Sequence, residues 1–477
     1  MFKNREINMC EGALLKNLII YALPLMATNV LQLLFNAADV AILGFFAGDD
    51  PVAAVGSTGA LINLIVGLFV GLSVGANVLI AKCVGENNEK RARRVVGMSI
   101  LISVLIGVLL AVFGVCFANT FLTWMGCDKD VIGMATTYVQ IYFIGMPIML
   151  LYNFCASILR AVGDTVRPLI FLMIGGIVNV GLNILFITVF KKDVEGVAIA
   201  TVVSQGISAV LCIITLLRND GFAKLELRRI KIYPKELLMM TKIGLPAGIQ
   251  GCLFSLSNVL IQSSINEFGK QVMAANSIAA QLDGFIYNSM NAVSLSALAF
   301  VSQNYGAKNF ERIKKTILYA LGVVTVVGVV IGGIVILIAP MVCGIMAEEP
   351  IVAELAFTRI LIISSTYFTC GLMDVLSNSL RGLGRSTLSM ILTLAGTCLF
   401  RILYIYTIFQ WLSKNLTTLY MIYPVSWVVC ICMFIVAYIF VMKKVDKELK
   451  QPSVDDDELV ERDAQSSEQS DLGEQIA

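Results

Sequence analysis

Apolar stretches of about 20 residues or more follow one another along almost the whole chain. Inside a bilayer only helices and closed barrels satisfy all their backbone groups, and a helix needs about 20 apolar residues to cross it. Charged residues make up 14% of the 477 residues, whereas soluble domains carry about 25%. We therefore expect an all-α polytopic membrane protein with no large soluble domain. The expected spans are residues 14–46, 51–81, 95–122, 131–159, 168–190, 196–217, 243–266, 272–303, 317–345, 352–380, 386–411 and 418–442.

Lysine and arginine are distributed unevenly among the loops between these spans. The loops on one side, with both chain ends as far as Lys447 and with Lys16 at the start of the first span, carry 26 of them, and the loops on the other side carry five. Basic loops stay in the cytoplasm, so both termini are expected there, in a multi-pass protein of the plasma membrane. Solvated cytoplasmic loops explain this charge, and no nucleic-acid partner is expected.

Three sequence segments recur at an offset of 221 or 222 residues. The pairs are KNLIIYALPL (16–25) with MMTKIGLPAG (239–248), KCVGENNEKRARR (82–94) with SQNYGAKNFERIKK (302–315), and ILRAVGDT (158–165) with SLRGLGRS (379–386). Two repeats of six helices each are expected, and an even helix number gives both halves the same orientation. They would form a parallel repeat about an axis along the membrane normal, as in carriers.

These boundaries divide the chain into five expected parts. They are an N-terminal cytoplasmic segment (1–13), an N-lobe (14–217), a cytoplasmic linker (218–242), a C-lobe (243–442) and a cytoplasmic tail (443–477). From residue 446 the chain has eleven acidic and three basic residues and no aromatic residue, so the tail is expected to be disordered.

Several function classes lack their usual motifs in this sequence. The chain contains no histidine, and its twelve cysteines are scattered, which argues against a zinc site and a disulfide scaffold. There is no P-loop, HExxH or GxSxG motif, no acidic motif such as DDxxD in the loops and no filter-like motif. A secondary carrier is therefore expected rather than an enzyme or a channel, without a cofactor and as a monomer.

The first span carries polar residues in the segment NVLQLLFNAADVAILG (29–44). Asn29, Gln32, Asn36 and Asp39 are spaced by 3, 4 and 3 residues, which places them on one face of a helix. Polar groups are costly in an apolar medium, and an acid inside the membrane is a functional candidate. Packing between helices is the alternative role for such residues.

Further segments resemble the multidrug and toxic compound extrusion (MATE) family. They are the two Leu-Pro motifs at Pro24 and Pro246, the NAAD segment, GLSVGANVLIAKCVG (71–85), and the paired turns LRAVGDTVRP (159–168) and LRGLGRSTLS (380–389). The resemblance covers about residues 14–442. It implies two six-helix lobes that export organic cations and other drugs in exchange for H⁺ or Na⁺.

The resemblance also implies an N-lobe site. Asp39 matches the family's acid on the first helix, and Asn179 and Asn183 match amide positions on the fifth. Asp39 would bind a proton or, together with amide and hydroxyl oxygens, Na⁺, and the residue types do not separate the two ions. Pro24 would allow the first helix to bend. The other expected members of the coupling site are Thr201, Tyr138 and Asn36, and the expected substrate contacts are Gln32, Phe35, Asn153 and Met173.

The second lobe departs from this pattern, because Ile261 stands where the first lobe has Asp39. Asp283, Asp374 and Arg401 lie at apparent membrane depth and could form a cation site or an ion pair, with Asp374 and Arg401 as the expected pair. A lipid-linked oligosaccharide flippase of the same superfamily is the main alternative. Such proteins carry several cationic residues in the central cavity. Here only Arg401 is a clear candidate, which favours drug export over the flippase. A lipid-modifying membrane enzyme and an ion channel are more distant alternatives.

Overall fold

The apolar stretches fold into long α-helices. The computed structural model describes residues 6–347, 349–412 and 414–450, and no β-strand occurs in these ranges. The helices of the first half are α1 (Leu14–Ala47), α2 (Asp49–Gly85), α3 (Glu89–Trp124), α4 (Ile132–Ile144), α5 (Met146–Ala161), α6 (Val166–Thr188) and α7 (Val194–Arg218).

The second half begins with a short 3₁₀ turn, η1, and then follows the same order of helices. Its elements are η1 (Leu227–Arg229), α8 (Pro234–Asn266), α9 (Lys270–Gly306), α10 (Phe310–Met346), α11 (Pro350–Ser364), α12 (Tyr367–Gly382), α13 (Ser386–Thr393), the π-helix η2 (Leu394–Leu399), α14 (Phe400–Tyr404), the π-helix η3 (Ile405–Leu412), α15 (Leu416–Tyr420) and α16 (Ile422–Lys450). Residues up to Phe434 form one compact unit, and a second unit begins at Ile435.

In the described part of the chain, ten helical segments are long and apolar enough to cross a membrane, and two bent helix pairs each add one span. The bend between α4 and α5 is 50°, and the bend between α11 and α12 is 44°. The first bend coincides with Pro147, which has no N–H for a helical hydrogen bond. The all-α fold and the twelve predicted spans are confirmed.

The two halves repeat each other down to their turns. The first and last residues of α2 and α9 are both 221 positions apart. Asn88 caps α3 by accepting a hydrogen bond from the backbone N–H of Arg91, and Asn309 caps α10 in the same way with Arg312, both at 3.0 Å. The predicted repeat is therefore present in the structure as two lobes of matching topology.

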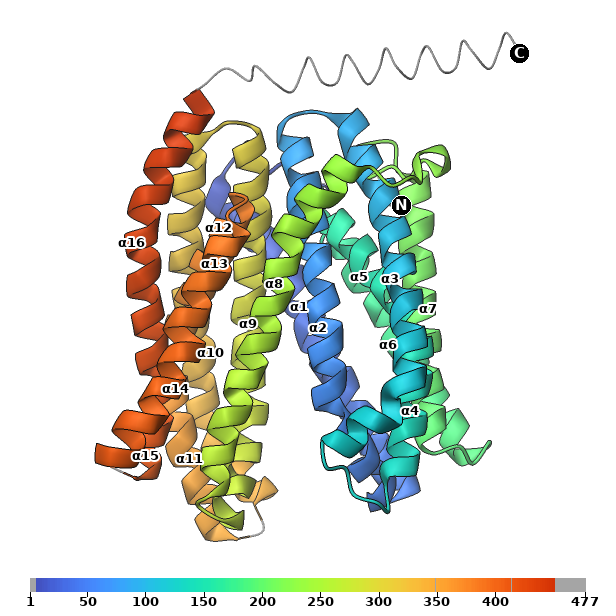
Figure 1. The fold of residues 1–477 in the computed structure, drawn as a ribbon, viewed down its shortest axis with the longest axis vertical. Helices are drawn as coiled ribbons and strands as arrows, with labels where there is room; N and C mark the ends of the chain where they lie inside the picture. The colour runs from blue at the N-terminus through green and yellow to red at the C-terminus, as the bar shows by residue number, and fades with distance from the viewer. Residues whose placement is uncertain (1–5, 348, 413, 451–477) are drawn as a thin grey trace. The chain divides into compact units, whose positions relative to one another are not determined.

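Within the first unit, the two lobes, formed by α1–α7 and by the chain from α8 to Phe434, meet along α2 and α8, which lie side by side (Figure 1). Gly71 and Gly75 face Gly244 and Gly248, so each helix presents a GxxxG stripe to the other. A Cβ on Gly244 would lie 2.6 Å from Leu72 Cα, and a Cβ on any of the other three would overlap backbone atoms of the facing helix. The absence of side chains at these positions is what allows this close contact.

A second set of contacts between the lobes lies at the end that carries the basic loops. Gly85 and Gly306 are matched by the repeat, and a Cβ on either would overlap a backbone carbonyl of the other lobe. Gln303 Nε2 donates a hydrogen bond to the carbonyl oxygen of Ala161 at 2.7 Å, joining α9 to the end of α5.

The N-terminal segment is held by the ends of helices from both lobes. Met9 is buried, and the Arg312 guanidinium donates hydrogen bonds to the carbonyls of Met9, Glu11 and Gly12 at 3.0, 2.6 and 3.1 Å. The backbone N–H of Ile7 donates to the carbonyl of Gly163 at 3.2 Å.

Several helices extend beyond the predicted spans, among them α8 and α16. α8 begins at Pro234, inside the predicted linker. Proline is favoured in the first helical turn because its fixed φ suits a helix, and because the N–H groups of that turn have no partner within the helix, so the missing N–H costs nothing. α16 continues to Lys450, where an ion pair of 2.7 Å joins Lys450 to Asp446 one turn earlier. The rest of the predicted disordered tail, 451–477, lies outside the described residues.

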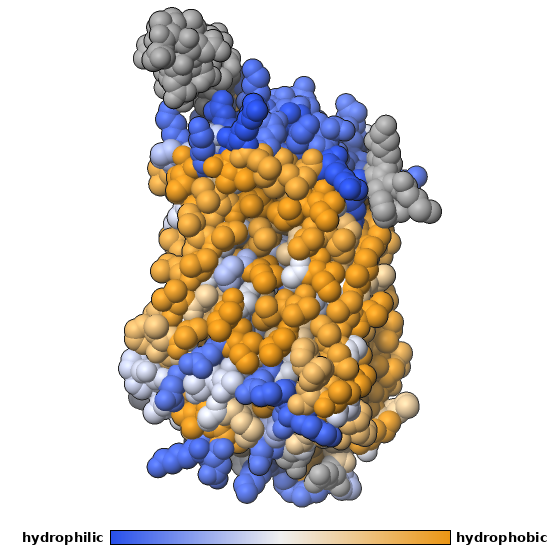
Figure 2. All heavy atoms as spheres, turned by 90° about the vertical axis from the view of Figure 1, so that its right-hand side faces the viewer, coloured by the Kyte–Doolittle hydropathy of each residue, from blue (hydrophilic) through white to orange (hydrophobic). Residues whose placement is uncertain are grey.

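The surface has the pattern expected of a membrane protein. Figure 2 shows apolar residues over most of one face and polar residues gathered towards its two ends. Large apolar side chains such as Leu109, Phe117 and Val210 are exposed on the helices of the N-lobe. In water such exposure would be costly, whereas lipid tails accept it without loss.

Candidate functional sites in the two lobes

The N-lobe brings Asp39 of α1 together with the two amides of α6. Asn183 Nδ2 donates a hydrogen bond of 2.6 Å to Asp39 Oδ1 and lies 3.4 Å from Asn179 Oδ1. Both asparagines are buried, and they share one face of α6 because they are four residues apart. Gly176 makes room for this contact, since a Cβ there would overlap the ring of Phe35 on α1.

A small cavity of about 40 Å³ lies beside this carboxylate. Its walls are formed by Phe35, Asn36 and Asp39 of α1, Asn179 of α6, Thr201 of α7 and other residues of α6 and α7. A water molecule needs about 10–15 Å³ of such space, so the cavity can hold a small ion or a few waters. Carboxylate, amide and hydroxyl oxygens, the ligand types that hard cations prefer, therefore surround one small space.

Other residues predicted for the N-lobe site do not line this small cavity. Tyr138 is buried in an apolar cluster to which helices α1–α7 contribute, close enough to Asp39 to interact with it electrostatically, and its ring packs against Tyr142 with centroids 6.1 Å apart. Asn153 donates to the carbonyl of Met149 in its own helix at 2.9 Å. Gln32 and Met173 are exposed side chains of α1 and α6, outside the small cavity.

The predicted hinge lies in a continuous helix. α1 is helical on both sides of Pro24. Thr28 Oγ1 donates a hydrogen bond of 2.7 Å to the carbonyl of Pro24, and Asn29 Nδ2 donates one of 3.0 Å to the carbonyl of Asn288 on α9. The polar face of α1 thus contacts the opposite lobe as well as α6.

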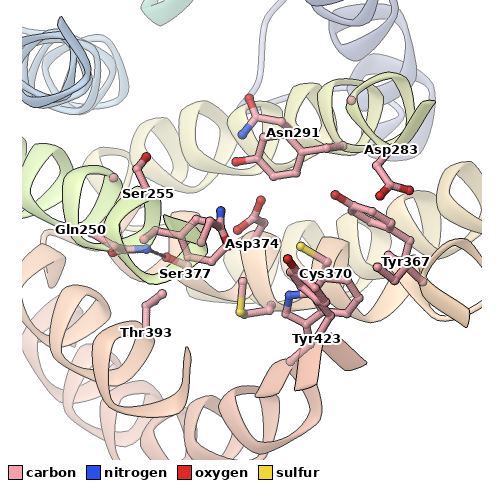
Figure 3. A pocket seen from close by; sticks show the side chains of 18 of the residues that line it. Gln250, Ser255, Asp283, Asn291, Tyr367, Cys370, Asp374, Ser377, Thr393 and Tyr423 are labelled. Atoms are coloured by element: carbon pink, nitrogen blue, oxygen red, sulfur yellow. Dashed lines mark hydrogen bonds between the residues drawn. The ribbon is translucent and has the colours of Figure 1, made fainter. Parts of the chain in front are cut away.

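A much larger cavity of about 640 Å³ lies mainly in the C-lobe, and Asn63 and Gly67 of α2 also line it. Asp283, Asp374 and Arg401, the three candidates of the second lobe, all line it, and Figure 3 shows both aspartates among its wall residues. Its other walls are rich in amides and aromatic rings. They include Gln250, Asn258, Gln262, Asn276, Asn291, Asn378, Phe254, Tyr287, Tyr367, Tyr423 and Trp427.

The predicted ion pair between Asp374 and Arg401 is wrong. The ion pair that the described residues form on this cavity is between Arg359 Nη1 and Asp283 Oδ2, at 2.8 Å. Arg401 instead donates to Asn258 Oδ1 at 3.0 Å and to Ser426 Oγ at 3.1 Å. Its guanidinium is therefore held by neutral groups of α8 and α16.

Two further arginines of the cavity were missed by the sequence analysis. Arg359 falls near the end of a predicted span, although its apolar neighbours in FTRILII are a signal that it is buried. Arg381 belongs to a turn that counts among the basic cytoplasmic segments, yet it lines the cavity and donates to Asn378 Oδ1 at 2.8 Å. Three arginines therefore line this cavity instead of one, which removes the sequence-based argument against the flippase.

Comparison with protein families agrees with this architecture. The MatE family model matches the chain twice, over residues 24–185 and 246–407. The chain belongs to the MatE family. The two matches begin at the two Leu-Pro motifs, and their starts are separated by the offset of the repeat. The resemblance drawn from the sequence is confirmed.

Relatives of this MatE protein are known in sequence and in structure. It is 26% identical over 437 residues to the probable multidrug resistance protein YoeA of Bacillus subtilis, covering 90% of this chain and 94% of the relative. The probable multidrug resistance protein YpnP of the same organism is 26% identical over 64% of this chain and 68% of its own length. A crystal structure of MATE in the bent conformation has a TM-score of 0.87 at 20% identity, with 94% of this chain and 100% of that chain covered.

The buried Arg359–Asp283 pair of this MatE protein leads to a stability prediction. Replacing Arg359 by methionine is expected to lower the free energy of unfolding by about 3–5 kcal/mol, because it leaves a buried carboxylate unpaired. The double variant Arg359→Met with Asp283→Leu should recover much of this loss. Thermal unfolding in detergent is the measurement, and Lys192→Met, which breaks an exposed pair with Glu195, is the control. Equal destabilisation by the single and double variants would contradict the prediction.

Proposed function

We propose that this MatE protein is a secondary active exporter of drugs and small organic cations. It would exchange them for H⁺ or Na⁺ in the plasma membrane, with both termini in the cytoplasm. The observation that carries the proposal is Asp39 within a membrane-spanning helix, bonded to Asn183 beside a cavity of ion size. The names of YoeA and YpnP, which describe multidrug resistance proteins, support it.

The proposed coupling step is a change of charge at Asp39. With a proton or a sodium ion bound, the carboxylate is neutralised and its interaction with Asn183 changes. α1 then shifts relative to α6, with Pro24 as the point where α1 bends most easily. The shift moves Gln32 and Phe35 on α1 relative to Asn153 and Met173, the proposed substrate contacts. The protein needs no cofactor and no catalytic residue for this cycle, and it acts as a monomer.

The contacts between the lobes suggest which side is closed. The GxxxG stripes of α2 and α8 and the contacts of Gly85 and Gly306 lie towards the end that carries the basic loops. If these loops are cytoplasmic, this conformation is closed to the cytoplasm. Export then requires the glycine contacts to separate in another state, which is the alternating access of a two-lobe carrier.

The second candidate function is flipping of a lipid-linked oligosaccharide. It is favoured by one observation, the three arginines on the C-lobe cavity, since diphosphate groups are bound by guanidinium groups. In a flippase of this kind, the small cation-sized cavity at Asp39 would have no role.

The experiment uses purified protein in liposomes. Ethidium movement is followed under a pH gradient alone and then under a Na⁺ gradient alone, with empty liposomes as the reference. Transport under one gradient supports the exporter and names the coupling ion. If neither gradient drives ethidium while a fluorescent prenyl-diphosphate oligosaccharide changes leaflets, the flippase replaces the exporter.

A further inference from the structure

Arg401 is a buried cation with no acidic partner among the described residues. Its side chain is 1% exposed, and the groups that bind its Nε and Nη1 atoms, Ser426 Oγ and Asn258 Oδ1, are neutral. Its Nη2 atom has no hydrogen-bond partner. A charge taken out of water is costly unless an opposite charge and hydrogen bonds compensate for it. The compensation for Arg401 is therefore incomplete in the protein alone.

The repeat shows that this charge is a local departure of the C-lobe. At the offset of 221, Arg401 corresponds to Val180, the neighbour of Asn179 in the N-lobe site. At the offset of 222 between Pro24 and Pro246, Ile261 stands where the N-lobe has Asp39. The corresponding helix of the N-lobe, α6, is regular from end to end, whereas Arg401 lies on the short α14 between two π-helical segments. π-Helical segments occur often at functional sites. The N-lobe site thus has an acid on α1 that the C-lobe lacks, and the C-lobe has a base at the position that matches Val180 on α6.

The surroundings of Arg401 hold its guanidinium group in one orientation. Its carbon Cζ lies 5.1 Å from the centre of the Phe254 ring and 5.0 Å from that of Tyr423. Together with Asn258 and Ser426, these rings hold it on the wall of the 640 Å³ cavity. Rigid guanidinium groups suit oxyanions, since they bind carboxylate and phosphate with two parallel hydrogen bonds.

The other charges of the cavity leave a positive surplus. Arg359 is paired with Asp283, and Asp374 can compensate only one of the two remaining arginines, Arg381 and Arg401. An incoming anion would restore the balance.

We propose that the C-lobe cavity binds the oxyanion group, carboxylate or phosphate, of an amphipathic ligand at Arg401, with the aromatic walls of the cavity contacting its apolar part. If the bound ligand is also transported, the proposal rests on the proposed function. The binding of the ligand itself does not depend on that function. It assigns the two lobes complementary chemistry, a cation at Asp39 and an anion at Arg401.

The test compares a carboxylate probe with its neutral amide. Dansylglycine and dansylglycinamide are titrated into the purified full-length protein, and energy transfer from tryptophan to dansyl reports binding. Trp427 lines the cavity, whereas Trp124 and Trp411 are exposed, so Trp427→Phe should remove most of the signal. Wild type is expected to bind dansylglycine about tenfold more tightly than the amide, the value of a charge-assisted hydrogen bond. Arg401→Gln should abolish this preference, and Arg401→Lys should retain part of it.

The source of the anion is resolved by competition. Displacement of dansylglycine by farnesyl diphosphate but not by farnesol would point to phosphate ligands. If neither compound displaces dansylglycine while the preference for the acid over the amide persists, the ligands are carboxylates. Equal wild-type affinity for acid and amide, including no binding of either, would overturn the proposal. An unchanged preference for the acid in Arg401→Gln would also overturn it. So would loss of this preference in Asp374→Asn, because that result would mark Arg401 as the ion-pair partner of Asp374. If Arg401→Gln does not fold, Arg401→Lys decides. Ethidium transport in liposomes tests the exporter separately, because ethidium has no oxyanion.

Discussion

Asp39→Asn is expected to reduce gradient-driven ethidium transport at least tenfold, to near the level of empty liposomes. Asparagine has the shape of aspartate but cannot be neutralised by a proton or supply a carboxylate to Na⁺. Its side-chain oxygen can still accept the hydrogen bond from Asn183, so the contact between α1 and α6 should survive. The variant should therefore fold and bind substrate while losing the dependence on the ion.

Two controls separate coupling from folding in this experiment. Asp50→Asn removes an exposed carboxylate at the start of α2 and should transport like wild type. Ethidium exchange without any ion gradient should persist in Asp39→Asn. Wild-type rates under a gradient in Asp39→Asn would rule out this residue as the coupling site and direct attention to Asp374.

Gly248→Leu is expected to lower the free energy of unfolding by at least about 2 kcal/mol and to stop transport. Even a Cβ at this position would overlap the carbonyl of Leu68, and a backbone atom cannot rotate away as a side chain can. The leucine would push α8 from α2 and open the contact between the lobes. The thermal unfolding midpoint in detergent and ethidium transport in liposomes are the two measurements.

Gly251 provides a matched control on the same helix. A Cβ at Gly251 has nothing within 4 Å, so Gly251→Leu adds the same apolar volume without pressing on α2. This variant should unfold near the wild-type temperature. If Gly248→Leu and Gly251→Leu behave alike, the close packing of the GxxxG stripes is not important for this protein.

The sequence by itself was sufficient for the features that depend on local order along the chain. The length and spacing of apolar stretches predict twelve spans, because crossing a bilayer sets a minimum helix length. The duplicated turn motifs predict the repeat that the caps at Asn88 and Asn309 display. The pairing of Asp39 with Asn183 could be anticipated from the family resemblance, which placed both residues in the N-lobe site. Both lie on polar faces of regular helices, so helical periodicity shows which way each side chain points.

The interactions of the C-lobe were decided only by the tertiary structure. Asp283 and Arg359 are 76 positions apart, and nothing in either segment names the other as its partner. The predicted Asp374–Arg401 pair failed for the same reason, and Arg401 bonds Asn258 and Ser426 instead. Helical periodicity predicts which residues share a face of one helix. Which faces meet, and which buried charge is left without a counterion, depends on how the helices pack.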